Sequence, residues 1–279
     1  MDIYLINLER RPDRLSHVTH QLDRLQLPFE LFRAIDAQNE NVELPAVQHD
    51  RFVVNHKKSP VRGEIGCAAS HIGVWQRFLE TDEEYALVLE DDINIGDELP
   101  LIQDQMQSLG LDFLNLSSNA PYTVDGSTLS ELCTSTASER PKFFQRSARR
   151  KWSILEWRRR WRIFRLHPLA NGHIVCECDP APALGSGYII SRKAAQAFMT
   201  TAEQLYFPID LIWRFSPGKL RQAFLARPIV TQTQQDSDIS GRFDQGRIAL
   251  KYRLMRPILK SRRLRRRIDV LRLYGFLRH

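Results

Sequence analysis

The sequence contains little that a membrane-spanning or disulfide-linked protein would need. No stretch of its 279 residues approaches the roughly 18 consecutive apolar residues of a membrane span. Only four cysteines occur, at positions 67, 133, 176 and 178, and they form no paired C-x-x-C spacing. We therefore expect reduced, mostly buried thiols, with neither a zinc site nor a disulfide framework. The residues that follow Met1 lack the basic start and the length of a signal peptide, so we expect a cytoplasmic protein.

The excess of basic residues is confined to two segments. The formal net charge is +7, but residues 249–279 hold eleven Lys and Arg with one acid, and residues 146–165 hold nine with one acid. The rest of the chain keeps 20 of the 40 bases and 31 of the 33 acids. Such local basicity indicates a polyanionic surface as a partner, rather than a protein that is basic throughout.

Strand-like apolar runs alternate with helical patterns along the chain. Strands are expected at residues 2–8, 29–35, 85–89, 111–116, 184–190 and 223–230. Helices are expected from Pro12, over residues 63–79, after a cap at Ser191, and over residues 208–213, whereas residues 38–60 are polar enough for a loop. This order predicts an α/β fold with a mixed, mainly parallel sheet and helices on both faces. Ligands of such sheets bind beyond the carboxyl ends of the strands.

Three carboxylates stand side by side where the predicted strand 85–89 ends: Glu90, Asp91 and Asp92. Adjacent oxygen ligands suit Mg²⁺ or Mn²⁺, whereas a solvated acidic turn is the structural alternative. The apolar run before the triplet favours an ion, because the core then fixes the acids in place. A second acidic cluster, with Asp236 and Asp238, follows a late strand and can converge on the same ion.

Asp210 is a single acid among apolar residues near an expected helix start. Backbone N–H groups can orient a carboxylate there as a general base, although this segment alone favours the interpretation as an ordinary helix cap. His71 is by itself more often a packed histidine than a catalyst. The spacing of Gly63 and Gly66 is too common to identify a phosphate loop.

Seven motifs, in order, resemble glycosyltransferase family 25, the bacterial lipooligosaccharide galactosyl- and glucosyltransferases related to the collagen galactosyltransferases. They are IYLINLERRPDR (3–14), FRAID (32–36), GEIGCAASH (63–71), ALVLEDD (86–92), GSGYIIS (185–191), PIDLIW (208–213) and SDI (237–239). The resemblance implies a GT-A-like catalytic domain over residues 1–246. A basic-aromatic insertion at about 122–169 and a basic amphipathic tail at 247–279 lie outside these motifs.

The resemblance also implies a nucleotide-sugar site and a role for each matching residue. Mn²⁺ (or Mg²⁺) would be held by Glu90 and Asp92, with Asp236 and Asp238 completing the metal or sugar contacts. Asp210 would be the catalytic base. The nucleotide-sugar site would comprise Asn7, Leu8, Arg14, Ala34, Asp36, Gly63, Glu64, Gly66, His71, Asp91 and Gly187.

The expected reaction is inverting transfer of galactose or glucose from UDP-galactose or UDP-glucose to a lipooligosaccharide or lipopolysaccharide acceptor sugar. The protein would work peripherally on the cytoplasmic face of the inner membrane, where Trp152, Trp157 and Trp161 and the arginines of residues 262–267 contact anionic lipid. Two other classes of function compete. One is a metal-dependent nuclease or nucleic-acid-binding protein, disfavoured because no nucleic-acid module is present. The other is a membrane-docked interaction protein without catalysis.

Overall fold

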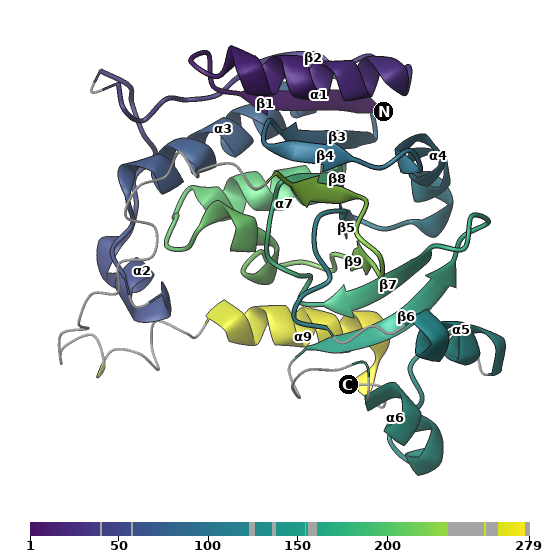
Figure 1. Ribbon diagram of the computed structural model, residues 1–279. Helices are drawn as coiled ribbons and strands as arrows, with labels where there is room; N and C mark the ends of the chain where they lie inside the picture. The colour runs from purple at the N-terminus through teal and green to yellow at the C-terminus, as the bar shows by residue number, and fades with distance from the viewer. Residues whose placement is uncertain are drawn as a thin grey trace.

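A mixed eight-stranded sheet runs through the computed structural model (Figure 1). The structure describes residues 1–39, 41–56, 58–122, 126–135, 138–153, 155, 161–233, 254 and 262–276. The strand order is β2-β1-β3-β8-β5-β9-β7-β6, and a separate two-stranded sheet pairs β4 with β10. The pairing directions leave six strands of the large sheet pointing one way, with β7 and β8 opposed. The mainly parallel α/β class expected from the sequence is confirmed.

The strands are β1 (Asp2–Asn7), β2 (Glu30–Arg33), β3 (Tyr85–Glu90), β4 (Ile93–Ile95), β5 (Phe113–Asn115), β6 (Arg162–Pro168), β7 (Ile174–Asp179), β8 (Gly187–Ser191), β9 (Gln222–Leu225) and β10 (Val230–Gln232). The helices are α1 (Pro12–Arg24), α2 (His49–His56), α3 (Arg62–Leu79), α4 (Leu99–Leu109), α5 (Gly126–Ser135), α6 (Arg146–Ser153), α7 (Arg192–Ala202), the 3-10 helix η1 (Ile209–Arg214) and α9 (Arg262–Tyr274).

Helices cover both faces of the large sheet. Side chains of α3, α7 and η1 form one apolar core with one face, and side chains of α1 and α4 form a second core with the other. Local signals explain two of the helix starts. Pro12 occupies the first position of α1, and the Ser191 hydroxyl oxygen accepts a hydrogen bond from the N–H of Ala194 at 3.1 Å.

Two local predictions are wrong. Residues 38–60 contain α2, whose Phe52 and Val54 are buried and whose start is fixed by a hydrogen bond from the N–H of Gln48 to the carbonyl of Leu205 at 2.8 Å. Tertiary packing therefore makes a helix from a segment of polar composition. The single strand expected over residues 223–230 is two strands in different sheets, and Pro228 lies in the break between them.

Part of the expected insertion at 122–169 lies in the core. β6 pairs with β7 at the edge of the large sheet, and Trp152 is 1% exposed. A tryptophan so deeply buried cannot reach a lipid surface, so that part of the membrane prediction is wrong. Trp161 is half-buried, with the guanidinium of Arg214 4.6 Å above its ring, and Trp157 lies outside the described residues.

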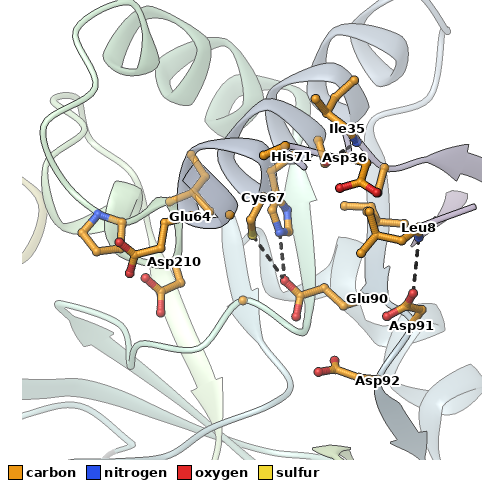
Figure 2. A pocket seen from close by; sticks show the side chains of 18 of the residues that line it. Leu8, Ile35, Asp36, Glu64, Cys67, His71, Glu90, Asp91, Asp92 and Asp210 are labelled. Atoms are coloured by element: carbon orange, nitrogen blue, oxygen red, sulfur yellow. Dashed lines mark hydrogen bonds and ion pairs between the residues drawn. The ribbon is translucent and has the colours of Figure 1, made fainter. Parts of the chain in front are cut away.

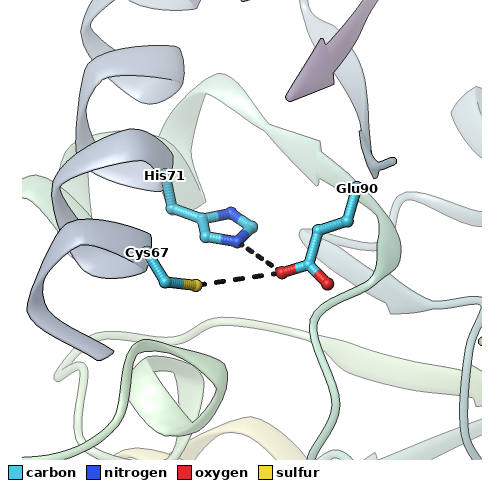
Figure 3. Close-up of side chains that lie close together, drawn as sticks. All are labelled: Cys67, His71 and Glu90. Atoms are coloured by element: carbon cyan, nitrogen blue, oxygen red, sulfur yellow. Dashed lines mark hydrogen bonds and ion pairs between the residues drawn. The ribbon is translucent and has the colours of Figure 1, made fainter. Parts of the chain in front are cut away.

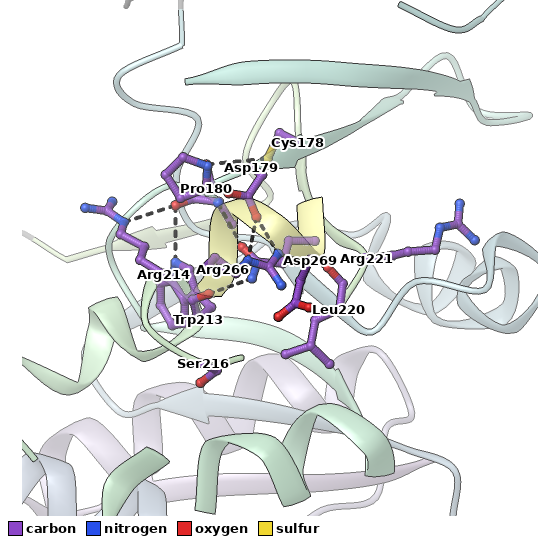
Figure 4. Close-up of polar contacts among 12 residues, drawn as sticks. Cys178, Asp179, Pro180, Trp213, Arg214, Ser216, Leu220, Arg221, Arg266 and Asp269 are labelled. Atoms are coloured by element: carbon purple, nitrogen blue, oxygen red, sulfur yellow. Dashed lines mark hydrogen bonds and ion pairs between the residues drawn. The ribbon is translucent and has the colours of Figure 1, made fainter. Parts of the chain in front are cut away.

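The C-terminal helix α9 packs against the body of the protein (Figure 4). Arg266, 4% exposed, donates from Nε to Asp179 at 2.8 Å and from Nη2 to the carbonyl of Leu220 at 3.0 Å. Farther along, the ring of Tyr274 stacks on Phe164 with centroids 3.9 Å apart. The predicted basic amphipathic helix is present, but its inner face contacts protein and includes one of the arginines assigned to lipid. Among the described residues, no helix is long and apolar enough to cross a bilayer.

Replacing Arg266 with Ala should lower the free energy of unfolding by about 3–5 kcal/mol, because Asp179 would remain buried without its ion-pair partner. Urea denaturation measures the change. Arg267→Ala is the matched control, since Arg267 is exposed on the same helix, and it should change stability by no more than about 0.5 kcal/mol. Equal stability of the two variants would show that α9 does not belong to the cooperative unit.

Candidate functional site

A cavity of about 860 Å³ lies at the carboxyl ends of β1, β2 and β3. Leu8, Ala34 and Glu90, each at or just after the end of one of these strands, line it. The strands are parallel, so their ends meet at one edge of the sheet, and the volume is typical of a small-molecule site. The first turn of α3, the segment before β8 and the start of η1 complete the wall.

The three acids of the triplet, Glu90, Asp91 and Asp92, differ in their contacts. Asp91 turns toward the end of β1, where its carboxylate accepts hydrogen bonds from Asn7 Nδ2 at 2.7 Å and from the Leu8 N–H at 3.4 Å. Arg14 Nη1 lies 3.4 Å from the other oxygen of the same carboxylate. Burial raises the pKa of Asp91, and the contacts with Asn7 and Arg14 oppose that rise. The central acid of the triplet therefore holds β1 and α1 against the end of β3.

Asp92 has a strongly perturbed carboxyl group. Burial, followed by the charges of Glu90 and Asp91, raises its pKa to about 6. Its Oδ1 is buried and has no hydrogen-bond partner among the described residues. The backbone carbonyl of Asp92 accepts from the N–H of Thr233 at 2.8 Å, which brings the end of β10 to the cavity. A buried carboxylate oxygen without a donor has the chemistry of a cation ligand.

Glu90 reaches the cavity from the last position of β3, and its side chain is 24% exposed. Its Oε1 lies 3.2 Å from His71 Nε2 and 3.9 Å from Cys67 Sγ, both on α3 (Figure 3). The other ring nitrogen of His71 lies 2.9 Å from the hydroxyl of Tyr188. His71 is therefore a packed histidine whose ring is fixed at both nitrogens and still faces the site.

Two further acids line the cavity, Asp36 just beyond β2 and Glu64 in the first turn of α3, and each has protein partners. Asp36 accepts from Arg10 Nε at 2.8 Å and from the Gln38 N–H at 3.0 Å, and these contacts hold its pKa below the ordinary value despite burial. Glu64 accepts from Lys58 Nζ at 2.5 Å, in the first turn of α3. Positive side chains and the N-terminus of a long helix thus border the cavity.

Asp210 stands in the first turn of η1, across the cavity from Leu8 and Asp91 (Figure 2). Gly185 lies against it, since a Cβ added there would be 3.6 Å from Asp210 Cβ. Both residues line the cavity.

Most of the residues named from the sequence line this one cavity: Leu8, Arg14, Ala34, Asp36, Gly63, Glu64, His71, Glu90, Asp91, Asp92 and Asp210. Asn7, Gly66 and Gly187 do not line it. Asn7 holds Asp91 from behind, and the two glycines serve close packing. A Cβ at Gly66 would lie 2.8 Å from the carbonyl oxygen of Ile35, and one at Gly187 would lie 2.8 Å from Val230. Asp236 and Asp238 fall outside the described residues.

Sequence reasoning missed Cys67. The spacing of four residues from His71 was a usable signal, because residues four apart lie on the same face of a helix. The spacing indicates a site only together with Glu90, which the tertiary structure places beside that face of the helix.

Comparison with known proteins gives a consistent family. The model of "Glycosyltransferase family 25 (LPS biosynthesis protein)" matches residues 1–213. A "Glycosyltransferase 25 family member" from Aedes aegypti is 38% identical over 96 residues, which are 33% of this chain and 16% of that protein. A "Putative glycosyltransferase" from Haemophilus influenzae is 34% identical over 117 residues, 39% of this chain and 40% of that protein.

Human "Procollagen galactosyltransferase 2" is 29% identical over 97 residues, again 33% of this chain and 16% of the relative. The matches thus span well under half of each of these relatives.

Proposed function

Because this chain belongs to glycosyltransferase family 25, we propose that it transfers a hexose, galactose or glucose, from a UDP-sugar to a sugar of a lipooligosaccharide or lipopolysaccharide acceptor. The observation that carries the proposal is the cavity at the ends of β1–β3, which collects Glu90, Asp92 and Asp210. The alternation of helices with the parallel strands β1, β2 and β3 supports a GT-A arrangement. The relatives named as galactosyltransferases favour galactose as the donor sugar.

The nucleotide would bind at the β1 and β2 side of the cavity. Leu8 and Ala34 offer apolar contact there, and Asp36 offers carboxylate oxygens already oriented by Arg10 and Gln38. The first turn of α3 and the nearby arginines provide positive potential for a diphosphate. His71 and Asp91 act indirectly in this scheme, by holding Glu90 and the β1 end in position.

A divalent cation, Mn²⁺ or Mg²⁺, fits the acidic side of the same cavity. Asp92 has a buried oxygen without a donor among the described residues, and Glu90 is partly exposed to the cavity, so these two would hold the ion. A cation bound there would stabilise the negative charge that develops on the departing diphosphate. Asp236 and Asp238 remain candidates by sequence alone.

Asp210 would act as the general base. In a direct displacement, an acceptor hydroxyl oxygen forms a bond to the anomeric carbon while the bond from that carbon to the diphosphate oxygen breaks. The hydroxyl proton passes to the Asp210 carboxylate, and attack from the face opposite the leaving group inverts the anomeric centre. Gly185 lines the cavity beside Asp210.

The proposed membrane contact rests on exposed side chains at the start of the first basic segment, rather than on the buried Trp152. Phe143 and Phe144 are 58% and 59% exposed, and Lys142 and Arg146 beside them are exposed as well. Exposed aromatic rings next to bases suit a peripheral contact with anionic lipid.

A donor screen tests the proposed function directly. With Mn²⁺ and a lipooligosaccharide acceptor, the protein should release UDP from UDP-galactose or UDP-glucose. Without the acceptor, the rate of UDP release should be lower. Acceptor supplied in anionic vesicles should be used faster at low salt than at high salt, whereas acceptor in neutral detergent should show no such dependence. Failure of all UDP-sugars would refute the proposed donor class, and equal salt dependence in both formats would refute the membrane contact.

A further inference from the structure

Three side chains from two elements place different ligand atoms around one point. Cys67 and His71 are one turn apart on α3, and Glu90 ends β3 (Figure 3). Within the described residues, Cys67 Sγ, His71 Nε2 and a Glu90 carboxylate oxygen all lie within 4.8 Å of one another. The Glu90 oxygen is 3.2 Å from the nitrogen and 3.9 Å from the sulfur.

We propose that Cys67, His71 and Glu90 form a binding site for a thiophilic divalent cation of the Zn²⁺ class. Bonds of about 2.0–2.3 Å to a tetrahedral ion place the ligand atoms about 3.3–3.8 Å apart. The two separations from the Glu90 oxygen fall just outside either end of that range, and the sulfur and the nitrogen lie within 4.8 Å of each other, so side-chain rotation would bring the three atoms to tetrahedral spacing. A ligand set with one sulfur and one nitrogen favours zinc over the hard ions Mg²⁺ and Mn²⁺.

A second layer of side chains already orients the histidine. His71 Nδ1 lies 2.9 Å from the Tyr188 hydroxyl oxygen, which also accepts from Trp75 Nε1 at 2.9 Å. With the ion on Nε2, the Nδ1–H donates to Tyr188. Histidine ligands of metals are commonly held in this way by a hydrogen bond from the other ring nitrogen.

The fourth position of the ion would face the cavity, because all three ligands line it. Three protein ligands with an open position are the pattern of exchangeable or catalytic zinc sites, rather than closed structural ones. On binding, the Cys67 thiol gives up its proton to solvent and the imidazole presents the Nε2 lone pair.

This site is distinct from the oxygen-only site at Asp92, but the two share Glu90. A thiophilic ion would therefore withdraw Glu90 from a hard ion bound for the diphosphate, and Zn²⁺ should inhibit transfer that Mn²⁺ supports. That consequence rests on the proposed function, whereas the binding site itself does not.

Cobalt(II) is the probe, because it occupies zinc sites and is visible by absorption. The full-length chain, with its thiols reduced and no sugar donor or acceptor present, should bind Co²⁺ with a thiolate-to-metal charge-transfer band and the strong visible bands of a four-coordinate ion. The band should saturate at one ion per chain and disappear when Zn²⁺ is added. Since no substrate is used, failure here is separable from failure of the transferase assay.

Two variants and one control test the site. Cys67→Ser should abolish the charge-transfer band, and the matched control Cys133→Ser, which changes a half-buried thiol on α5, should retain it. Tyr188→Phe removes only the hydroxyl behind His71 and should weaken Co²⁺ binding about 10–100-fold. Circular dichroism verifies that each variant is folded. A wild-type spectrum without the charge-transfer band, or a band unchanged in folded Cys67→Ser, would overturn the assignment.

Discussion

Replacing Asp210 with Asn should lower kcat of sugar transfer by about 10²–10⁴-fold, the usual contribution of a general base. Asn has nearly the same shape and still accepts hydrogen bonds through its oxygen, but it cannot take the proton from the acceptor hydroxyl. The residue stands across the cavity from the β1 end, so donor binding should be unaffected.

The distinction is measured by combining UDP-release kinetics with calorimetric titration of UDP. Kd for UDP should match that of the wild type while kcat falls. The matched control is Asp104→Asn, on the exposed side of α4, which should keep full activity. Transfer by Asp210→Asn within about threefold of wild type would remove Asp210 as the base.

Replacing Asp92 with Asn should remove most metal-dependent transfer. Charge stabilisation by a bound cation is worth several kcal/mol, and each 1.4 kcal/mol corresponds to about tenfold, so a loss of about 10²-fold or more is expected. Titrating activity with Mn²⁺ should show that half-maximal activity requires a much higher Mn²⁺ concentration. UDP binding in the absence of metal should stay unchanged. Activity that survives the substitution with the same dependence on Mn²⁺ would refute the assignment of this ligand.

The same variant should be more thermostable than the wild type when metal is removed with a chelator. Folding raises the pKa of Asp92 from 3.8 to about 6, so the folded state binds this proton more tightly than the unfolded state. The stability gained from protonation is complete below about pH 4 and is lost as the pH rises through about 6. Asn carries no charge at any of these values.

Melting temperatures measured from pH 4 to pH 7.5 test this. The two proteins should be similar at pH 4, and Asp92→Asn should melt higher at pH 7.5, by about 2–4 °C for each kcal/mol. Added Mn²⁺ should stabilise the wild type at pH 7.5 and not the variant. A lower melting temperature for metal-free Asp92→Asn at pH 7.5 would mean that the ionised carboxylate is satisfied within the fold.

Much of the fold could be predicted where local signals agree with the tertiary structure. Pro12 opens α1, Ser191 caps α7, and residues 85–89 are an unbroken apolar run that belongs in the middle of a sheet. Where local signals were weak, packing decided. α2 is helical because Phe52 and Val54 are buried, and β4 and β10 are three-residue strands held by each other.

The basic segments show the limit of composition as evidence. Arg266 lies in a run of arginines that alone indicates a solvated or lipid-facing helix. Only the position of Asp179 at the end of β7, far away in the sequence, makes this arginine a buried ion-pair partner. Counting charges along the sequence does not indicate which carboxylate the fold places beside a given arginine.

By itself, the sequence determined the family, the α/β class, and the set of acids that gathers at one sheet edge. β3 ends at Glu90, so Asp91 and Asp92 lie beyond the strand, and the strand itself does not determine where their side chains point. Which of the three acids is held by the end of β1 was decided by the tertiary structure. The pairing of β1 beside β3 brings Asn7, Leu8 and Arg14 to Asp91, whereas Asp92 Oδ1 has no hydrogen-bond partner among the described residues. The same packing set Cys67 and His71 against Glu90, because contacts between α3 and β3 depend on the fold and leave no trace in local spacing.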